Sequence, residues 1–199
     1  VMEEKGVNEL FDAIKKIKTE VGATVISFVD AKEAILLDLA DYKISYPINE
    51  QLKFFMVADR FMFNNGEFED YEDMYAEFDK YLAQDLVEVE KQAEPFAIEF
   101  AKKHWNDEMH YFVGAGNQWG ATYSYAMCYW EEQLWLKTKS ITSNEFFHGM
   151  FEIVTKETPV TIYIGEDAQR PLSERVANFI PRICANYTII DSKDYELKG

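Results

Sequence analysis

Cysteine and histidine are scarce in this sequence. Two of the 199 residues are cysteine, Cys128 and Cys184, and three are histidine. The cysteines lack the spacing of metal ligands and each lies in an apolar stretch, which excludes a disulfide scaffold and favours two buried thiols in a reducing cytoplasm. No His-Glu-x-x-His pattern and no cluster of cysteine and histidine occurs, so we predict a cytoplasmic protein without a metal site or another cofactor.

Long hydrophobic runs and positive charge are also lacking. No segment approaches the roughly 20 consecutive apolar residues that cross a membrane. The sequence has 20 Lys and Arg against 36 Asp and Glu, a net charge of −16. This excess of acid argues against a nucleic-acid partner and against an anionic membrane surface, because both bind basic faces. A single phosphorylated metabolite is not excluded, since backbone N–H groups can hold one phosphate.

The composition is that of a folded protein, with 48% hydrophobic and 28% charged residues, and the length suits one domain or one domain with part of a second. Residues 9–21 keep apolar residues on one helical face up to Gly22, and residues 23–30 are a β-branched run. An alternating stretch follows at 42–46. This order of elements predicts the late part of an α/β unit over residues 1–47.

Helices are expected in the next part of the chain. Residues 48–64 have an apolar helical pattern that ends near Gly66. Residues 67–94 carry eleven acidic residues against two lysines. Such a run is either an acidic docking surface or the solvated face of a long helix, and the second interpretation is favoured because apolar residues keep a helical spacing. Pro95 is expected to kink this helix or to mark a break between two helices.

From residue 109 onwards, strand and helix patterns alternate, which predicts a parallel sheet covered on both faces. The helical pattern at 118–136 has apolar residues on more than one face, so we expect it to lie at or beside a subunit contact. The expected strands are 109–117 (which runs into a glycine loop), 137–142, 158–167 and 187–191, and the other helices are 144–154 and 171–183.

The glycine loop Gly114-Ala115-Gly116-Asn117 follows a strand and opens a helix, as a dinucleotide-binding loop does. That fingerprint also needs an acidic residue about 20 residues further on, at the end of the next strand. The next strand, 137–142, has none, so we predict no nicotinamide cofactor. A glycine loop at the carboxyl end of a strand remains a standard ligand position in α/β proteins.

The three histidines differ in their surroundings. His104 and His110 flank the start of a strand and are expected to be surface or structural residues. Glu145 precedes His148 by three residues, so that their side chains can share a helical face, and Gly149 allows a close backbone approach. Without further context, a structural histidine is still the favoured interpretation of His148.

Residues 111–183 resemble the second SIS (sugar isomerase) domain of the sugar-phosphate isomerase and deglycase family. Residues 143–153 are close to the family pattern S-G-E-F-x-H-G-P-x-E-I, with asparagine in place of its first glycine and methionine in place of its proline. Glu132 precedes His148 by 16 residues, the separation that the family uses between its catalytic glutamate and histidine. The Glu-Phe-Phe-His-Gly form is most similar to fructosamine 6-phosphate deglycases of the fructoselysine and glucoselysine type.

The resemblance implies an α/β fold, a three-layer, flavodoxin-like parallel sheet preceded by the tail of another SIS domain. Residues 1–47 would be the C-terminal part of the first SIS domain, 48–107 the connecting helices, and 108–199 the second SIS domain without its C-terminal helices. The chain thus resembles a fragment or a shortened paralogue. Glu3 and Glu4 stand where the family has a Ser/Thr-rich phosphate loop, so we expect the isolated chain to bind a sugar phosphate weakly and to be inactive alone.

The implied function is cleavage of a fructosamine 6-phosphate to an aldose 6-phosphate and an amine. Glu132 would be the base and His148 the acid/base partner, which suits a proton transfer between C1 and C2 of the sugar. The implied partners are a phosphosugar substrate and a second copy of the chain in a homodimer. Two alternatives stay open: a non-catalytic SIS module that binds a phosphosugar or only mediates dimerisation, and a sugar-phosphate isomerase of the same fold. The implied substrate-binding residues are Gly114, Gly116, Asn117, Ser143 and Glu145.

Overall fold

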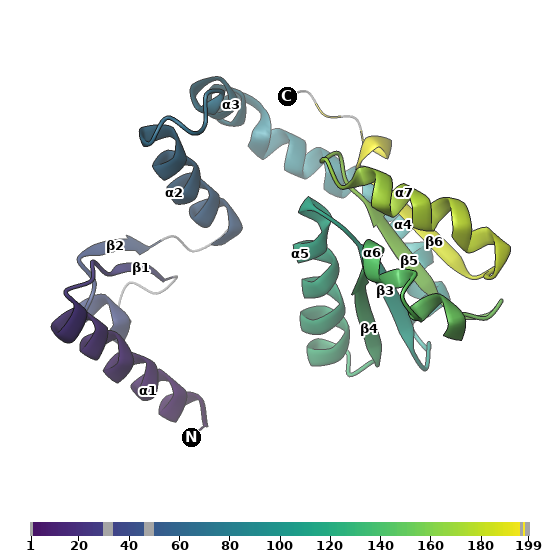
Figure 1. Ribbon diagram of the computed structural model, residues 1–199, viewed down its shortest axis with the longest axis horizontal. Coiled ribbons are helices and arrows are strands. Elements are labelled where there is room, and N and C mark those ends of the chain that lie inside the picture. Colours follow the sequence, from purple (N-terminus) through teal and green to yellow (C-terminus); the bar gives the residue numbers. More distant parts are fainter. Residues whose placement is uncertain (1, 30–33, 46–49, 196, 198–199) are drawn as a thin grey trace. The chain divides into compact units, whose positions relative to one another are not determined.

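The chain divides into two compact units, Val1–Ala76 and Glu77–Gly199, which are described separately as the first and second unit (Figure 1). No helix among the described residues is long and apolar enough to cross a membrane. The end of the predicted stretch 42–46 lies outside the described residues, as do the side chains of Glu3 and Glu4. The computed structural model describes residues 2–29, 34–45, 50–195 and 197.

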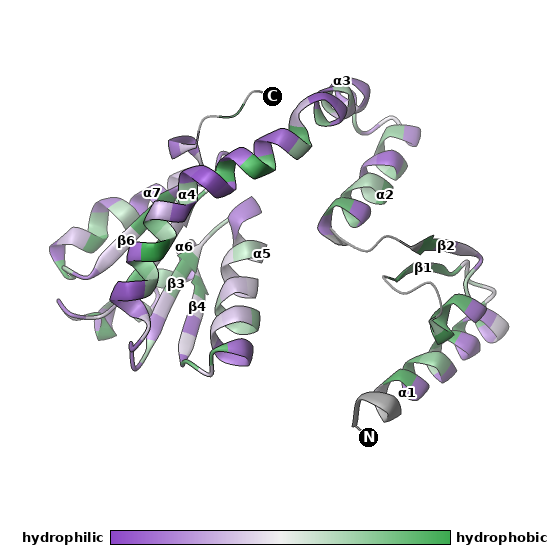
Figure 2. Cartoon of the chain, turned by 180° about the vertical axis from the view of Figure 1, so that it is seen from behind, coloured by the Kyte–Doolittle hydropathy of each residue, from purple (hydrophilic) through white to green (hydrophobic). Residues whose placement is uncertain are grey.

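A two-stranded parallel sheet lies in the first unit. Helix α1 (Met2–Lys16) continues as a π-helical turn, Ile17–Val21, and Gly22 ends it with a φ of 72°. Glycine adopts this left-handed conformation without strain, so the predicted helix end is confirmed. Strand β1 (Ile26–Val29), in hydrophobic colours in Figure 2, pairs in parallel with β2 (Tyr42–Ser45).

Two helices complete the first unit. Helices α2 (Glu50–Asn64) and α3 (Tyr71–Glu77) are separated by a turn at Gly66, whose φ is 75°. The Tyr75 hydroxyl donates a hydrogen bond of 2.8 Å to Asp59, which joins the two helices. The first unit nevertheless buries little of its apolar surface. The large side chains that α2 leaves exposed are Phe54, Phe55, Met56, Phe61 and Met62.

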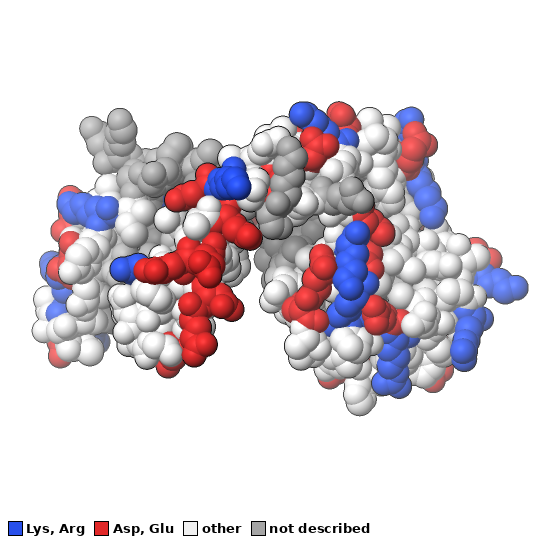
Figure 3. Space-filling view, turned by 90° about the horizontal axis from the view of Figure 1, so that it is seen from above, with Lys and Arg blue, Asp and Glu red and all other residues white. Residues whose placement is uncertain are grey.

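The long acidic helix opens the second unit. A π-helical turn, Phe78–Leu82, leads into α4 (Ala83–His104), which continues through Pro95, so the predicted alternative of a break is wrong. The acidic residues of the run at 67–94 are exposed, except for Asp85. Figure 3 shows Asp and Glu side chains gathered on the face seen from above. This exposure is what a solvated helix face requires.

A four-stranded parallel sheet forms the centre of the second unit, as predicted. The strands lie in the order β4-β3-β5-β6. Neighbouring strands end at the same edge; Gly114, the last residue of β3, pairs with Thr142, the last residue of β4. The bounds are β3 His110–Gly114, β4 Thr138–Thr142, β5 Val160–Ile164 and β6 Tyr187–Asp191.

Helices α4 and α5 cover one face of this sheet. Helix α5 (Asn117–Ser124) continues as a π-helical segment, Tyr125–Gln133. Phe100 of α4, Phe112 of β3 and Trp130 of the π-helical segment form one buried cluster. Because successive residues of a strand point to opposite faces, Phe112 and its neighbours divide between two such clusters.

Helices α6 and α7 cover the other face. Helix α6 (Ser143–Phe146) is followed by a 3₁₀ turn, Met150–Ile153, and α7 (Arg170–Phe179) returns along the sheet. Their apolar side chains pack on a buried cluster that includes Val113 and Ile162. Two helical layers around a parallel sheet confirm the predicted three-layer α/β fold. The predicted division into three parts stays a prediction.

Candidate functional site

The candidate site lies at the carboxyl ends of β3 and β5. In parallel α/β sheets, ligands bind where neighbouring strands lead to helices on opposite faces. Here β3 leads into α5 on one face, whereas its neighbour β5 leads into α7 on the other (Figure 1). The two loops that begin there are Ala115-Gly116 and Gly165-Glu166-Asp167.

Asp167 closes the space between these two loops. Its carboxylate accepts a hydrogen bond from the N–H of Asn117 at 2.8 Å and another from the N–H of Gln169 at 2.7 Å. These backbone bonds hold the pKa of Asp167 below its usual value, so the group is charged at neutral pH. A side chain at Gly116 or Gly165 would collide with this carboxylate. Both glycines therefore make room for Asp167.

This carboxylate limits the predicted substrate loop. The N–H of Asn117 is already bonded to Asp167, so a substrate oxygen reaches it only by displacing a carboxylate of the same chain, whose charge also repels a phosphate. The sequence interpretation missed Asp167 because it sought an acidic residue about 20 positions after the glycine loop, whereas Asp167 follows Asn117 by 50. The substrate-binding role of Gly116 and Asn117 stays a prediction.

Gly114 and Ser143 take part in packing. A side chain at Gly114 would collide with that of Thr122, whose hydroxyl donates a hydrogen bond of 2.6 Å to the carbonyl of Gln118, so this glycine lets α5 approach β3. The hydroxyls of Ser143 and Ser173, both buried, lie 2.9 Å apart and join α6 to α7. Contact of either residue with a substrate stays a prediction.

Glu145 and His148 lie in α6 and in the turn after it. Both side chains are exposed. The N–H of His148 donates to the carbonyl of Glu145 at 2.9 Å, a backbone contact of a helical turn. No hydrogen bond between the two side chains occurs among the described residues, so the orientation of His148 by Glu145 stays a prediction.

Glu132 lies in the helical layer on the opposite face. It is exposed near the end of the π-helical segment, and its neighbour Glu131 accepts a hydrogen bond of 2.5 Å from Thr138 at the start of β4. His148 lies between Phe147 and Met150, which pack in the layer of α6 and α7. The sheet therefore separates Glu132 from His148, and the structure does not bring them together within one chain.

An apolar surface surrounds Glu132. Tyr129, Leu134 and Trp135 are exposed, and Trp135 has 88% of its surface in solvent. Trp135 also has a φ of 58°, a left-handed conformation that costs a bulky residue about 1–3 kcal/mol. The second apolar face predicted for this helix is thus open to solvent in the single chain. The subunit contact expected there stays a prediction.

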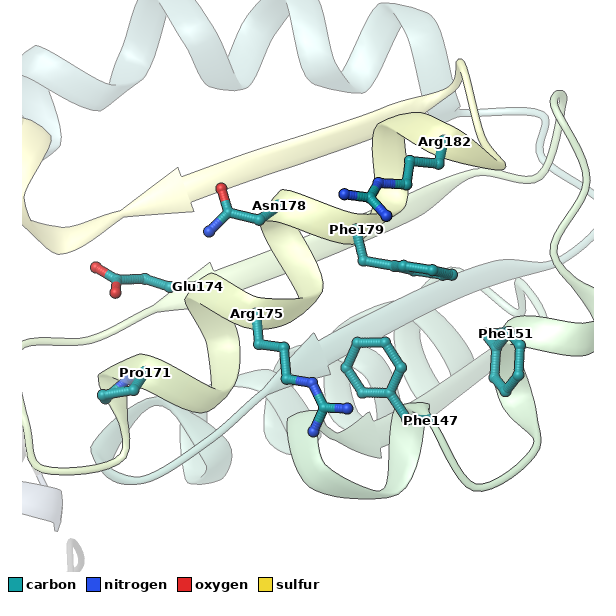
Figure 4. A pocket seen from close by; sticks show the side chains of 8 residues that line it. All are labelled: Phe147, Phe151, Pro171, Glu174, Arg175, Asn178, Phe179 and Arg182. Atoms are coloured by element: carbon teal, nitrogen blue, oxygen red, sulfur yellow. The ribbon is translucent and has the colours of Figure 1, made fainter.

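An open hollow of about 720 Å³ runs along α7, on the side of the sheet that carries His148 (Figure 4). The guanidinium of Arg175 lies 4.3 Å from the centre of the Phe147 ring. Arg182 supplies a second positive charge, so the hollow can accept an anionic group beside apolar rings. The lining residues are Phe147, Phe151, Pro171, Glu174, Arg175, Asn178, Phe179 and Arg182.

An ion-pair network fixes the loop after β5. Arg170 donates to the carbonyl of Gly165 at 2.9 Å, to Glu174 at 2.6 Å and to both carboxylate oxygens of Asp191 at the end of β6. The guanidinium keeps the pKa of Asp191 below its usual value. A two-pronged arginine–carboxylate pair of this kind adds geometric specificity, so it holds the ends of β5 and β6 in place.

Two other sequence expectations concern buried residues. His104 and His110 are both buried, so the alternative that they lie at the surface is wrong. Cys184 is buried, as expected, whereas Cys128 is only partly buried, and both thiols are free. Burial raises the pKa of Cys184, which keeps it protonated and unreactive.

Comparisons with known proteins agree with the resemblance. No protein-family profile matches the chain. It is 35% identical over 106 residues to the fructosamine deglycase FrlB of Bacillus subtilis, covering 53% of this chain. It is 28% identical over 109 residues to a fructoselysine 6-phosphate deglycase of Escherichia coli O157:H7, covering 49% of this chain. In each case the match spans 32% of the relative's length.

A solved structure gives the same result for the fold. The chain superposes with a TM-score of 0.81 on a proposed phosphosugar isomerase from Bacillus subtilis, at 26% identity, covering 94% of this chain and 58% of the other. The predicted resemblance to the sugar-phosphate isomerase and deglycase family, and the SIS fold that it implies, are confirmed.

Proposed function

We propose that this chain is part of a sugar-phosphate deglycase that cleaves a fructosamine 6-phosphate to an aldose 6-phosphate and an amine. The observation that carries the proposal is the segment 143–153, with its Glu-Phe-Phe-His-Gly sequence. It begins at the carboxyl end of β4 on the described sheet. Both curated relatives are named as deglycases, whereas the superposed structure carries the broader name of isomerase.

The reaction needs a proton moved between C1 and C2 of the sugar. We assign the base to Glu132 and the acid/base partner to His148, both of them solvent-accessible. Because the sheet separates the two side chains, one chain cannot offer both to one substrate. The proposal therefore requires Glu132 of one copy and His148 of another, and the exposed apolar surface around Glu132 supports such a contact.

Asp167 bears on how the substrate is held. Its charge disfavours phosphate at the loop after β3, so we place the phosphate elsewhere, while hydroxyl groups of the sugar are free to approach Glu145 and His148. The cationic hollow lined by Arg175 and Arg182 lies on the face that carries His148. The geometry thus favours a neutral part of the substrate near the glycine loop and an anionic part away from it.

The first test is turnover of fructosamine 6-phosphates, followed by mass spectrometry, with the full-length protein that carries this sequence. Glu132→Gln keeps the size of the side chain and removes its basicity, so turnover falls by about 10²–10⁴-fold. The matched control is Glu131→Gln, since Glu131 is the adjacent carboxylate and is occupied by Thr138. Normal turnover in folded Glu132→Gln protein would remove Glu132 from the mechanism.

The second test asks whether two copies share the site. Glu132→Gln and His148→Asn proteins are each expected to keep at most about a hundredth of the wild-type turnover when alone. If they exchange subunits at random, half of the dimers are mixed, and one of the two sites in each mixed dimer is intact, so activity returns to about a quarter of wild type. No return of activity in mixtures whose exchange is verified by native mass spectrometry would refute the shared site.

A non-catalytic phosphosugar-binding module is the second candidate. The separation of Glu132 from His148 by the sheet favours it, because a single chain then lacks a complete catalytic pair. This alternative predicts phosphosugar binding without turnover, and variants of Glu132 and His148 that bind as the wild type does.

A further inference from the structure

Three side chains converge at the edge of the sheet where β3 begins: His104, Asp107 and His110. His104 is the last residue of α4, His110 is the first of β3, and Asp107 lies in the turn between them. The N–H of Asp107 donates to the carbonyl of His104 at 3.2 Å. This turn brings ligand atoms of all three within 4.8 Å of one another, and no other such group of histidine, cysteine or carboxylate side chains occurs in the part of the chain that the structure describes.

One carboxylate oxygen of Asp107 joins the two imidazoles. Its Oδ2 lies 2.7 Å from Nδ1 of His104 and 2.8 Å from Nδ1 of His110. Nε2 of His110 lies 2.8 Å from the hydroxyl of Thr161, whereas the buried Nε2 of His104 has no partner among the described residues. An ionised carboxylate only accepts, so both Nδ1 atoms carry the proton and Nε2 of His104 is an acceptor without a donor.

We propose that His104, Asp107 and His110 bind a divalent transition-metal ion, with zinc as the expected occupant. Two imidazole nitrogens and one carboxylate oxygen form a ligand set that zinc accepts, with bonds of about 2.0–2.2 Å and one position left for water. Both rings are buried, and burial disfavours a charged imidazole. The neutral imidazole is the form that binds a metal.

The ion takes the place of the two Nδ1 protons. The present N···O distances are those of hydrogen bonds, so the carboxylate has to turn outward, and Asp107 has room because it lies in a turn with 16% of its side chain exposed. The protons then move from Nδ1 to Nε2. At His110 this proton faces the Thr161 hydroxyl, which can accept it, a supporting contact typical of metal-bound histidine. At His104 no described partner of Nε2 opposes the change.

The place of the cluster gives the ion a structural role that is independent of the proposed function. It ties the end of α4 to the start of β3. The His110 ring also packs against Trp130 with centroids 4.7 Å apart, two residues before Glu132. A bound ion would therefore stiffen the junction of helix, strand and π-helical segment, because it binds the folded state and not the unfolded one.

The test is zinc titration of the 199-residue chain carrying His148→Gln, which removes the histidine outside the cluster. We expect one ion per chain by calorimetry, and Co²⁺ in its place to give the visible absorption of a tetrahedral site. Asp107→Asn keeps the size of the side chain and removes its charge, so affinity falls by about 100-fold or more. The matched control Glu108→Gln changes the neighbouring exposed carboxylate and leaves affinity within about twofold.

A second measurement uses the chain with His104, Asp107 and His110 unaltered. Its result does not depend on whether the Asp107→Asn chain folds. In nitrogen NMR spectra of the two buried imidazoles, excess zinc is expected to replace the proton on each Nδ1. Three outcomes overturn the proposal: no binding at one equivalent, equal affinities of the Asp107→Asn and Glu108→Gln chains, or Nδ1 atoms that stay protonated in excess zinc. The cluster would then be a hydrogen-bonded clamp without an ion.

Discussion

The two units bury their apolar side chains to very different extents. In the second unit, Phe112 and Ile162 are completely buried on opposite faces of the sheet. In the first unit, Leu37 is the only buried hydrophobic residue among those that the structure describes, whereas Phe54 and Phe61 are exposed. Apolar area removed from water is the main source of folding free energy. The second unit therefore removes far more apolar area from water than the first.

A core substitution gives the largest expected difference between the units. Phe146 is completely buried in the second unit, so Phe146→Ala is expected to lower the free energy of unfolding by about 3–5 kcal/mol. Phe61→Ala, in the exposed part of the first unit, is the matched control, and a change within about 0.5 kcal/mol is expected there. Urea unfolding followed by circular dichroism measures both. Equal losses would contradict the difference in burial.

The pH dependence of stability is the next expected difference between the units, because all three histidines lie in the second unit. Burial lowers the pKa of His110 from 6.5 to about 4. Between these pH values the unfolded chain binds a proton that the folded unit does not, so the stability of the second unit falls as the pH drops, by about 3 kcal/mol in all. Urea midpoints between pH 7 and 5 measure the upper part of this loss, before most carboxylates titrate.

Removal of the buried imidazole is the control for this pH effect. His110→Gln is expected to flatten the slope of stability against pH. A slope that is the same in the wild-type and His110→Gln chains would show that His110 does not titrate in this window.

Two glycines with positive φ give a smaller difference. Gly116 has a φ of 55° and faces Asp167, whereas Gly22 in the first unit has a φ of 72° and open space around its α-carbon. Gly22→Ala is expected to cost about 1 kcal/mol for the backbone conformation alone, and Gly116→Ala about 2–3 kcal/mol because the Asp167 carboxylate must also move. Thermal unfolding of the two variants compares them. Similar losses of stability in the two variants would mean that the Asp167 carboxylate moves aside at no cost in free energy.

The smallest expected difference is between two ion pairs. In the first unit, Lys18 lies 2.7 Å from Asp41 and both side chains are about one-third exposed, so Asp41→Asn is expected to lower the stability only slightly, because solvent screens the pair. In the second unit, Asp191→Asn breaks a two-pronged and less exposed pair with Arg170, for which about 1–3 kcal/mol is expected. The difference is expected to widen in high salt, because the more exposed Lys18–Asp41 pair is screened more strongly than the Arg170–Asp191 pair. Urea midpoints at low and high salt test it.

The sequence predicted the alternation of strands and helices because each strand is bounded by glycine, proline or polar residues and each helix keeps an apolar stripe. It could not predict which faces would be covered. The helical pattern at 118–136 looked buried on all sides, yet Tyr129 and Trp135 are exposed in the single chain. Periodicity shows which residues share one face of a helix. Which element covers that face is decided by the tertiary structure, which the periodicity does not contain.

The candidate site was only partly predictable for the same reason. The segment with Glu145 and His148 is contiguous, so a pattern of residues reveals it. Asp167 meets Asn117 across two parallel strands, and nothing local links positions 50 residues apart. His104 and His110 show the converse case, because their spacing was visible but their burial depends on rings supplied by Phe100 and Trp130.

The exposed Trp135 gives the protein an optical probe of its own. Its indole stands in water, whereas that of Trp130 is buried under α4. Fluorescence from Trp135 is therefore expected at longer wavelengths and open to quenching by iodide, whereas that of Trp130 is shielded. Since Trp135 lies three residues from Glu132, anything that covers this surface shifts the emission to the blue and protects it from the quencher. With the other strongly exposed tryptophan, Trp105, replaced by phenylalanine, assembly at the end of the π-helical segment can be followed by this emission without a label.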